Sequence, residues 1–224
     1  MKMIFLSIMM LLSVLILASC KKQDIKLTPL ASLLVTNAVS GGGNLVLGTN
    51  AVPVYNNNFQ TYGMLTGSRE VKLLDTAVGI NKVYYNQTKD FVNGGMYSLF
   101  LGGTPAAVES VFIKEENIPS HTADVFGARV INLVTGGAPI SVNVQGSPNG
   151  SFVNSLAHKA ISTFKDISSL AAEGDKVFEF RNAATGDLIT SFTVPGYDLP
   201  RFRNITLVFA GSVDNESIIR TNNY

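Results

Sequence analysis

The sequence is poor in the residues on which most protein chemistry depends. Its 224 residues include one cysteine, two histidines and no tryptophan. A single cysteine excludes an intramolecular disulfide, and with two isolated histidines it cannot supply the ligands of a zinc site. Without tryptophan, the chain also lacks the ring that most often stacks on a sugar. Disulfide frameworks and zinc catalysis are therefore excluded, and a dedicated glycan-binding module is disfavoured.

The charged residues are equally uninformative about chemistry. The chain has 17 lysines and arginines against 16 aspartates and glutamates, so it has no basic surface for nucleic acid. The carboxylates are scattered without the spacing of a calcium-binding loop. The glycines 41–43 lack the lysine and hydroxyl residue of a phosphate loop. His121 and His158 are predicted to be solvated surface residues. We therefore expect no cofactor, no bound metal, no catalytic residue and no enzymatic activity, although a calcium site assembled across loops stays open.

The N-terminus has the pattern of an export signal. Met1-Lys2-Met3 precedes an apolar run over 4–17, which small residues follow. About 14 apolar residues fit a signal peptide, whereas a membrane-spanning helix needs about 20. The sequence predicts that residues 1–19 are removed from the mature protein.

The predicted cleavage site resembles the lipobox of bacterial lipoproteins. Leu17, Ala18 and Ser19 precede Cys20, the position at which such proteins carry a lipid. This resemblance implies that Cys20 attaches the mature chain to a membrane and that residues 20–30 form a tether. Lys21 stands where inner-membrane lipoproteins carry aspartate, which favours the outer membrane of the cell envelope and leaves the membrane face open. The alternative is an ordinary signal peptide that leaves Cys20 as a free thiol.

Beyond the tether, the composition is that of a β protein. Short apolar or alternating runs are separated by glycine, asparagine, aspartate and threonine, which is typical of strands joined by turns. The clearest predicted strands cover residues 31–37, 44–47, 69–74, 82–85 and 96–101. The segment 155–170 could form a helix or a strand and loop.

The second half repeats the first. Residues 37–42 (Asn-Ala-Val-Ser-Gly-Gly) match 132–137 (Asn-Leu-Val-Thr-Gly-Gly) at an offset of 95 positions. Residues 82–84 match 176–178 at 94, and 97–103 match 205–211 at 108. Order and spacing are kept, and one copy has the length of a small β-sandwich. We therefore expect two tandem immunoglobulin-like β-sandwich domains.

The domain boundaries follow from this repeat. The first β-sandwich is assigned to residues 31–117, a linker to 118–126 and the second β-sandwich to 127–224. The linker contains turn residues around Pro119 and His121. The longer final offset is assigned to a turn at 182–187 and a loop at 195–200, since insertions are tolerated at turns.

Most of the mature chain resembles the DUF4397 family, whose domains occur, often in pairs, in exported bacterial lipoproteins. Gly127-Ala-Arg-Val-Ile-Asn132, Pro139 and the strand 142–144 follow its opening pattern closely. The first copy follows it less well, because Leu33 to Val35 replace the arginine region and glycines 41–43 replace the proline turn. The family has no assigned biochemical function, so the resemblance implies fold and location only.

A group of aromatic residues is the one pointer to a ligand. Tyr55, Phe59 and Tyr62 lie beside the asparagines 56–58, and rings with amides are suited to sugars or to a protein partner. The alternative is that alternate members of this group fill the core. The main hypothesis is a non-enzymatic, lipid-anchored scaffold, adhesion or interaction module with an unidentified protein or glycan partner. The alternative hypothesis is an accessory polysaccharide-binding lipoprotein beside an outer-membrane transporter.

Overall fold

The protein is built of β-strands, as the composition predicts. The structure is a computed structural model that describes residues 28–76 and 82–223. In these residues fifteen strands are joined by turns and two short 3-10 helices. The predicted signal peptide, the lipobox and Cys20 lie outside the described residues, as does most of the tether.

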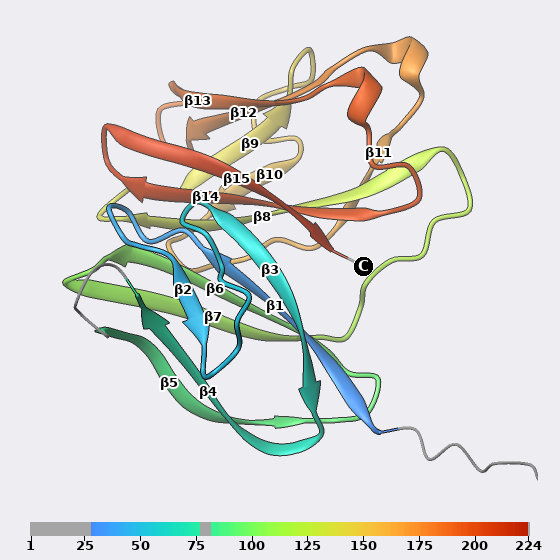
Figure 1. Cartoon of the computed structure of the whole chain (residues 1–224). Coiled ribbons are helices and arrows are strands. Elements are labelled where there is room, and N and C mark those ends of the chain that lie inside the picture. The colour runs from blue at the N-terminus through green and yellow to red at the C-terminus, as the bar shows by residue number, and fades with distance from the viewer. Residues whose placement is uncertain (1–27, 77–81, 224) are drawn as a thin grey trace, which may run out of the picture.

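The first half contains two sheets with a core between them. Its strands are β1 (Leu30–Asn37), β2 (Leu45–Leu47), β3 (Asn58–Leu65), β4 (Gly67–Asp75), β5 (Lys82–Phe91), β6 (Met96–Thr104) and β7 (Ala107–Glu115). The sheet β3-β1-β6-β7 lies against the sheet β2-β4-β5 (Figure 1). Leu33 and Val35 point from β1 into the core, where they meet Leu73 of β4. Alternation along each strand produces this arrangement, since successive side chains point to opposite faces.

The second half repeats this arrangement. Its strands are β8 (Val125–Thr135), β9 (Ile140–Val144), β10 (Val153–Leu156), β11 (Lys165–Ser168), β12 (Lys176–Asn182), β13 (Leu188–Val194), β14 (Asn204–Ser212) and β15 (Asn215–Asn223). The short helices η1 (Ala171–Glu173) and η2 (Gly196–Asp198) lie on either side of the β12–β13 pair in the chain. The sheet β11-β8-β14-β15 covers the sheet β10-β9-β12-β13, with Phe178, Phe180 and Phe209 buried between them.

The two halves meet through equivalent sheets, so the molecule has four layers (Figure 1). A third apolar cluster fills the space between the inner sheets, and its buried members are Ala38, Phe100, Ile131, Leu133, Val208, Ala210 and Ile219. Strands β6, β8 and β14 are consequently buried on both faces. This explains why their sequences are nearly continuous apolar runs rather than alternating ones.

The strand register reproduces two of the three offsets of the sequence repeat. In the first half β1 runs parallel to β6 with Leu33 opposite Tyr97, and in the second half β8 runs parallel to β14 with Ala128 opposite Ile205. These pairs differ by 95 and 108 positions. The glycines keep the same places: Gly103 and Gly211 both have positive φ, and a Cβ on either would lie 2.3 Å from a carbonyl oxygen of the following strand.

The third offset, 94 positions between residues 82–84 and 176–178, does not relate equivalent strands and was a wrong prediction. Residues 82–84 begin β5, but residues 176–178 begin β12, which pairs with β9 as β4 pairs with β2. The strand equivalent to β5 is β13, the other member of the corresponding hairpin. A lysine, a valine and an aromatic residue begin both strands, and the shared pattern reflects a half-buried strand start rather than an equivalent place in the fold.

Two further differences concern strand order and strand prediction. The first strand pairs with the third and the sixth, which differs from the ABED and CFG order of the immunoglobulin sandwich. Residues 58–65 form β3, which is not among the predicted strands. The segment 155–170 contains the end of β10 and the strand β11, with no helix.

Candidate functional site

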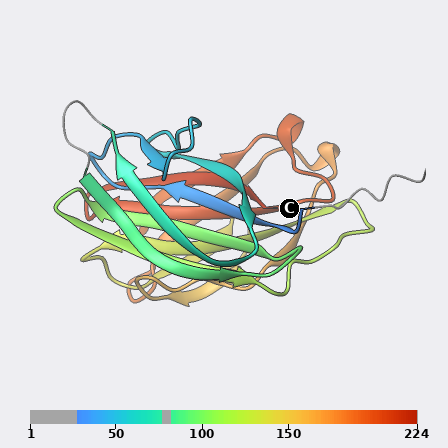
Figure 2. The ribbon, with the colours of Figure 1, turned by 60° about the horizontal axis from the view of Figure 1, so that its bottom comes forward.

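Four turns that contain or adjoin glycines gather at one end of the molecule, which we call the glycine-turn end. It comprises the β1–β2, β6–β7, β8–β9 and β14–β15 connections. Figure 2 shows β1 starting at the opposite end of the molecule. Ala38 and Gly41 of the first half line a shared crevice with Gly211 and Asn215 of the second. The two halves therefore present their turns in the same direction.

A cleft opens at this end of the second half, with a volume of about 480 Å³. We call it the β13 cleft, because Leu188 and Ile189 at the start of β13 form one wall. Val213, Asp214 and Glu216 of the β14–β15 hairpin form the other wall, and Val134, Ile140 and Phe209 form the floor. Leu188 and Val213 are 53% and 51% exposed, so the cleft presents apolar surface to solvent. Its size is in the range of pockets that hold small ligands or side chains.

The first half has a depression at the equivalent place. Gly42 corresponds to Gly137, and Pro105 corresponds to Val213, by the offsets of the repeat. Tyr84 and Ile189 are also equivalent, since each is the extra residue of a β-bulge in the strand that follows the hairpin turn. The same corner of both sandwiches is therefore hollowed.

The two corners differ in chemistry. In the first half the Tyr84 hydroxyl donates a 2.5 Å hydrogen bond to Asp75, which also accepts from the Gly43 amide. Burial raises the pKa of Tyr84 to about 12, and the bond to Asp75 adds to this effect. In the second half Ile189 replaces the tyrosine, and Asn182 accepts bonds from the amides of its own turn. The first corner thus contains a hydrogen-bonded tyrosine and aspartate, where the second has an isoleucine and an asparagine that do not bond to each other.

The negative charge of the β13 cleft comes from the β14–β15 turn. Asp214 and Glu216 stand where the first half has Ala106 and Val108. Glu216 accepts a bond from the Asp214 amide, and among the described residues neither carboxylate forms a salt bridge within 4.0 Å. The sequence contains this signal, since the repeat offset locates both acids. The sequence does not show that these two acids lie beside Leu188, which follows only from the fold.

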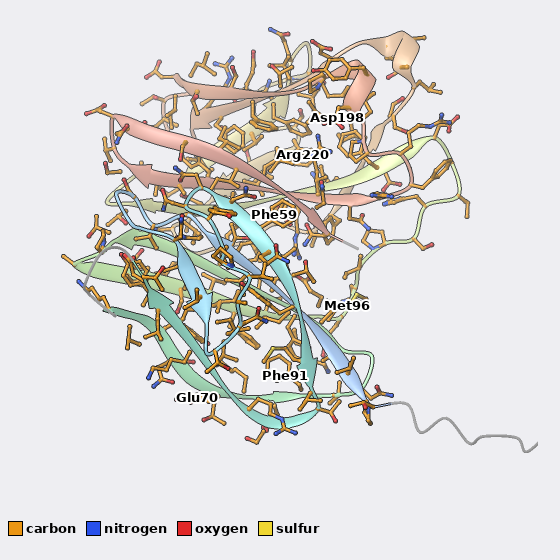
Figure 3. The ribbon with its side chains drawn as sticks, in the orientation of Figure 1. Phe59, Glu70, Phe91, Met96, Asp198 and Arg220 are labelled. Carbon is orange, nitrogen blue, oxygen red and sulfur yellow. The ribbon has the colours of Figure 1, made fainter. Side chains whose placement is uncertain are left out.

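The predicted aromatic site is not assembled. Tyr62 is only 4% exposed, belongs to the first core and donates its hydroxyl to the Val52 carbonyl at 2.8 Å. Phe59 is half-buried on β3, near the level at which the two halves meet (Figure 3). Tyr55 is 58% exposed and remains the one open ring of the three. Tyr62 thus fills the core, as the alternative interpretation of this group expected for some of its members, because the alternation of β3 directs this side chain inward.

The prediction for the two histidines is also wrong. The His121 side chain is 2% exposed, and its Nε2 lies 2.9 Å from Asn204, which donates to the Pro119 carbonyl. The His158 Nε2 lies 2.6 Å from Glu109 of the first half. His121 therefore connects the segment that links the two halves to β14. His158 contributes to the interface between the two halves.

A second contact between the halves is ionic and buried. Arg129 of β8 forms two bonds with Glu115 of β7, at 2.5 and 2.9 Å, and its Nε donates to Thr206 at 2.9 Å. The side chains of Arg129 and Glu115 are 7% and 4% exposed. A paired and hydrogen-bonded arginine of this kind defines one relative placement of the two halves.

No group of three metal-ligating side chains occurs in residues 28–76 and 82–223. In the same residues, no helix is long and apolar enough to cross a membrane. The sequence matches no protein-family model and no curated protein.

Proposed function

We propose that the protein is a lipid-anchored, non-enzymatic interaction module of the cell envelope, in which two β-sandwich domains present one binding end away from the membrane. The main support is the position of Leu30, which begins β1 at one end of the molecule. The cleft and the crevice lie at the other end, the glycine-turn end. A lipid on Cys20 would therefore hold the opposite end nearest the bilayer. The tether 20–30 reaches at most about 35 Å, which keeps that end close to the membrane.

The rigid connection between the domains supports this role. The apolar cluster around Phe100 and Ile131 and the ion pair of Glu115 with Arg129 join the inner sheets over a continuous surface. Loops held on such a frame are the usual place for binding sites. In this proposal the two domains are immunoglobulin-like in architecture, with their own strand order, and the resemblance to DUF4397 lipoproteins agrees with their location.

The polysaccharide-binding alternative is weakened by the position of Tyr62 in the core. A ring that fills a core cannot stack on a sugar, and Tyr55 by itself offers a single platform. We therefore favour a protein partner over a glycan.

Metabolic labelling with a radioactive fatty acid tests the anchor directly. The full chain and a Cys20→Ala variant would be expressed in a Gram-negative host, and membranes would be separated by density. We expect label and outer-membrane location for the wild type and neither for the variant. A wild-type chain that is exported without label would overturn the anchored role. Protease treatment of intact cells then distinguishes a surface location from a periplasmic one.

A further inference from the structure

The outer edge of β13 is an open strand without charge. The strand reads Leu-Ile-Thr-Ser-Phe-Thr-Val, and within the described residues it pairs with β12 only. Its equivalent in the first half, β5, carries Lys82, Lys89 and Asp90. Charged side chains on an edge strand prevent pairing with other chains, and β13 lacks this protection.

Comparison with the other edges makes β13 the best-placed open edge. Strands β7 and β15 carry charged side chains, and β2, β10 and β11 have at most four residues. Strand β3 is also uncharged, but it contacts β15 of the other half. The bulge at Ile189 interrupts β13 at its first residues, which leaves a regular edge from Thr190 to Val194.

The β13 cleft lies at the beginning of this edge. A strand that paired with Thr190 to Val194 and continued past Ile189 would bring its next side chains to the cleft. Leu188, Ile189 and Val213 would cover an aliphatic stem, and the carboxylates of Asp214 and Glu216 would face its charged tip. Lysine and arginine combine such a stem with a positive tip.

We propose that β13 binds an extended segment of a partner protein by strand addition, and that a lysine or arginine next to the paired residues enters the β13 cleft. Main-chain hydrogen bonds would supply affinity and the cleft would supply specificity, as in other cases of strand addition. Charge complementarity selects this occupant over a second copy of the chain, because a second β13 contains no basic residue to place between the carboxylates. This inference rests on the proposed interaction role and names the class of partner.

Fluorescence anisotropy with designed peptides tests the inference on the full chain in detergent micelles. The probe is a labelled octapeptide of alternating threonine and valine with one lysine at each end, because a parallel strand brings its N-terminal end to the cleft and an antiparallel strand its C-terminal end. Its two comparison peptides replace both lysines with glutamate, or carry N-methyl groups on the amides of one edge. We expect saturable binding of the probe and roughly tenfold weaker binding of both comparison peptides, which lose the charge contact or the main-chain bonds.

Variants locate the binding. The combined change Asp214→Asn and Glu216→Gln should weaken binding of the lysine peptide by about fivefold. It should not weaken binding of the glutamate peptide. Thr193→Lys should weaken all the peptides, because it adds a charge to the edge. The matched control Glu70→Gln removes an exposed carboxylate from β4 of the first half, far from the cleft (Figure 3), and should change nothing. Urea unfolding of each variant confirms that it is folded.

Three results would overturn the inference: no binding by the wild type, equal binding of the lysine and glutamate peptides, or equal effects of the cleft and control variants. Sedimentation that shows a dimer disrupted by Thr193→Lys, together with no peptide binding, would assign the edge to a second copy and also overturn it. Fatty-acid labelling of Cys20 is measured separately, so a failure here is distinguishable from a failure of the anchored role.

Discussion

Arg129 and Glu115 join the two halves through a buried ion pair with two hydrogen bonds. No local sequence pattern indicates that these two residues meet. Glu115 ends β7 and Arg129 lies near the start of β8, with the connection between the halves separating them. The arginine also lies 4.3 Å from the centre of the Phe164 ring and donates to Thr206. Phe164 and Thr206 of the second half thus contact one guanidinium whose counter-ion belongs to the first half.

Removing either partner should destabilise the protein strongly. Glu115→Ala or Arg129→Ala leaves an uncompensated buried charge, for which a loss of about 3–5 kcal/mol in the free energy of unfolding is expected. Urea titration followed by circular dichroism measures this. The neighbouring pair Lys114 and Glu116 is an internal control, because its side chains are 51% and 65% exposed. Its removal should cost less than about 1 kcal/mol, and equal costs for the two pairs would contradict the burial argument.

Alkaline pH should destabilise the first half of the protein through its buried tyrosines. Burial raises the pKa of Tyr62 and of Tyr84 to about 12, above the ordinary value of 10.0. Their contribution to the free energy of unfolding is therefore complete below pH 10 and is lost as the pH rises from about 10 to 12. Burial also raises the pKa of Tyr85, so absorbance titration of the phenolates should show late-ionising groups at Tyr62, Tyr84 and Tyr85, of which Tyr84→Phe removes one. A Tyr84→Phe variant with the same late ionisation would refute the assignment.

The equivalent glycines of the two halves should respond equally to alanine. In Gly103→Ala and Gly211→Ala the new Cβ meets a carbonyl oxygen at 2.3 Å, and both positions have positive φ. We expect each to lose more than about 2 kcal/mol of stability. Gly63→Ala in β3 is the control, since nothing lies within 4 Å of its Cβ, and should stay within about 0.5 kcal/mol. Thermal unfolding measures all three, and a neutral Gly211→Ala would refute the equivalence.

The two tyrosines of the predicted aromatic site should differ strongly in their contribution to stability. Tyr62→Ala empties a core position and should cost about 3–5 kcal/mol, whereas Tyr55→Ala removes an exposed ring and should cost less than about 0.5 kcal/mol. Chemical denaturation of both variants is sufficient. A folded, stable Tyr62→Ala protein that has lost binding to a glycan would restore the carbohydrate hypothesis.

Much of the fold can be predicted from the sequence because its signals are local. Short apolar or alternating runs predict β1, β4 and β6, and the glycines at 41–42 and 136–137 mark the same turn twice. Strand β3 was not among the predicted strands because Asn58 and Gly63 are uncommon in strands, and its pairing with β1 decides its state instead. The assignment of β12 to the place of β5 failed because a short pattern at the start of a strand does not identify its partner.

The sequence by itself determined the all-β class, the duplication with its offsets of 95 and 108, and the apolar runs that end up buried on both faces. These follow from side-chain alternation and from the few residues that a turn accepts. Only the tertiary structure decided that the equivalent sheets face each other, that Tyr62 and His121 are buried, and that Asp214 lies beside Leu188. Such contacts depend on which strands meet across a layer, and residues distant in sequence carry no local signal of that meeting.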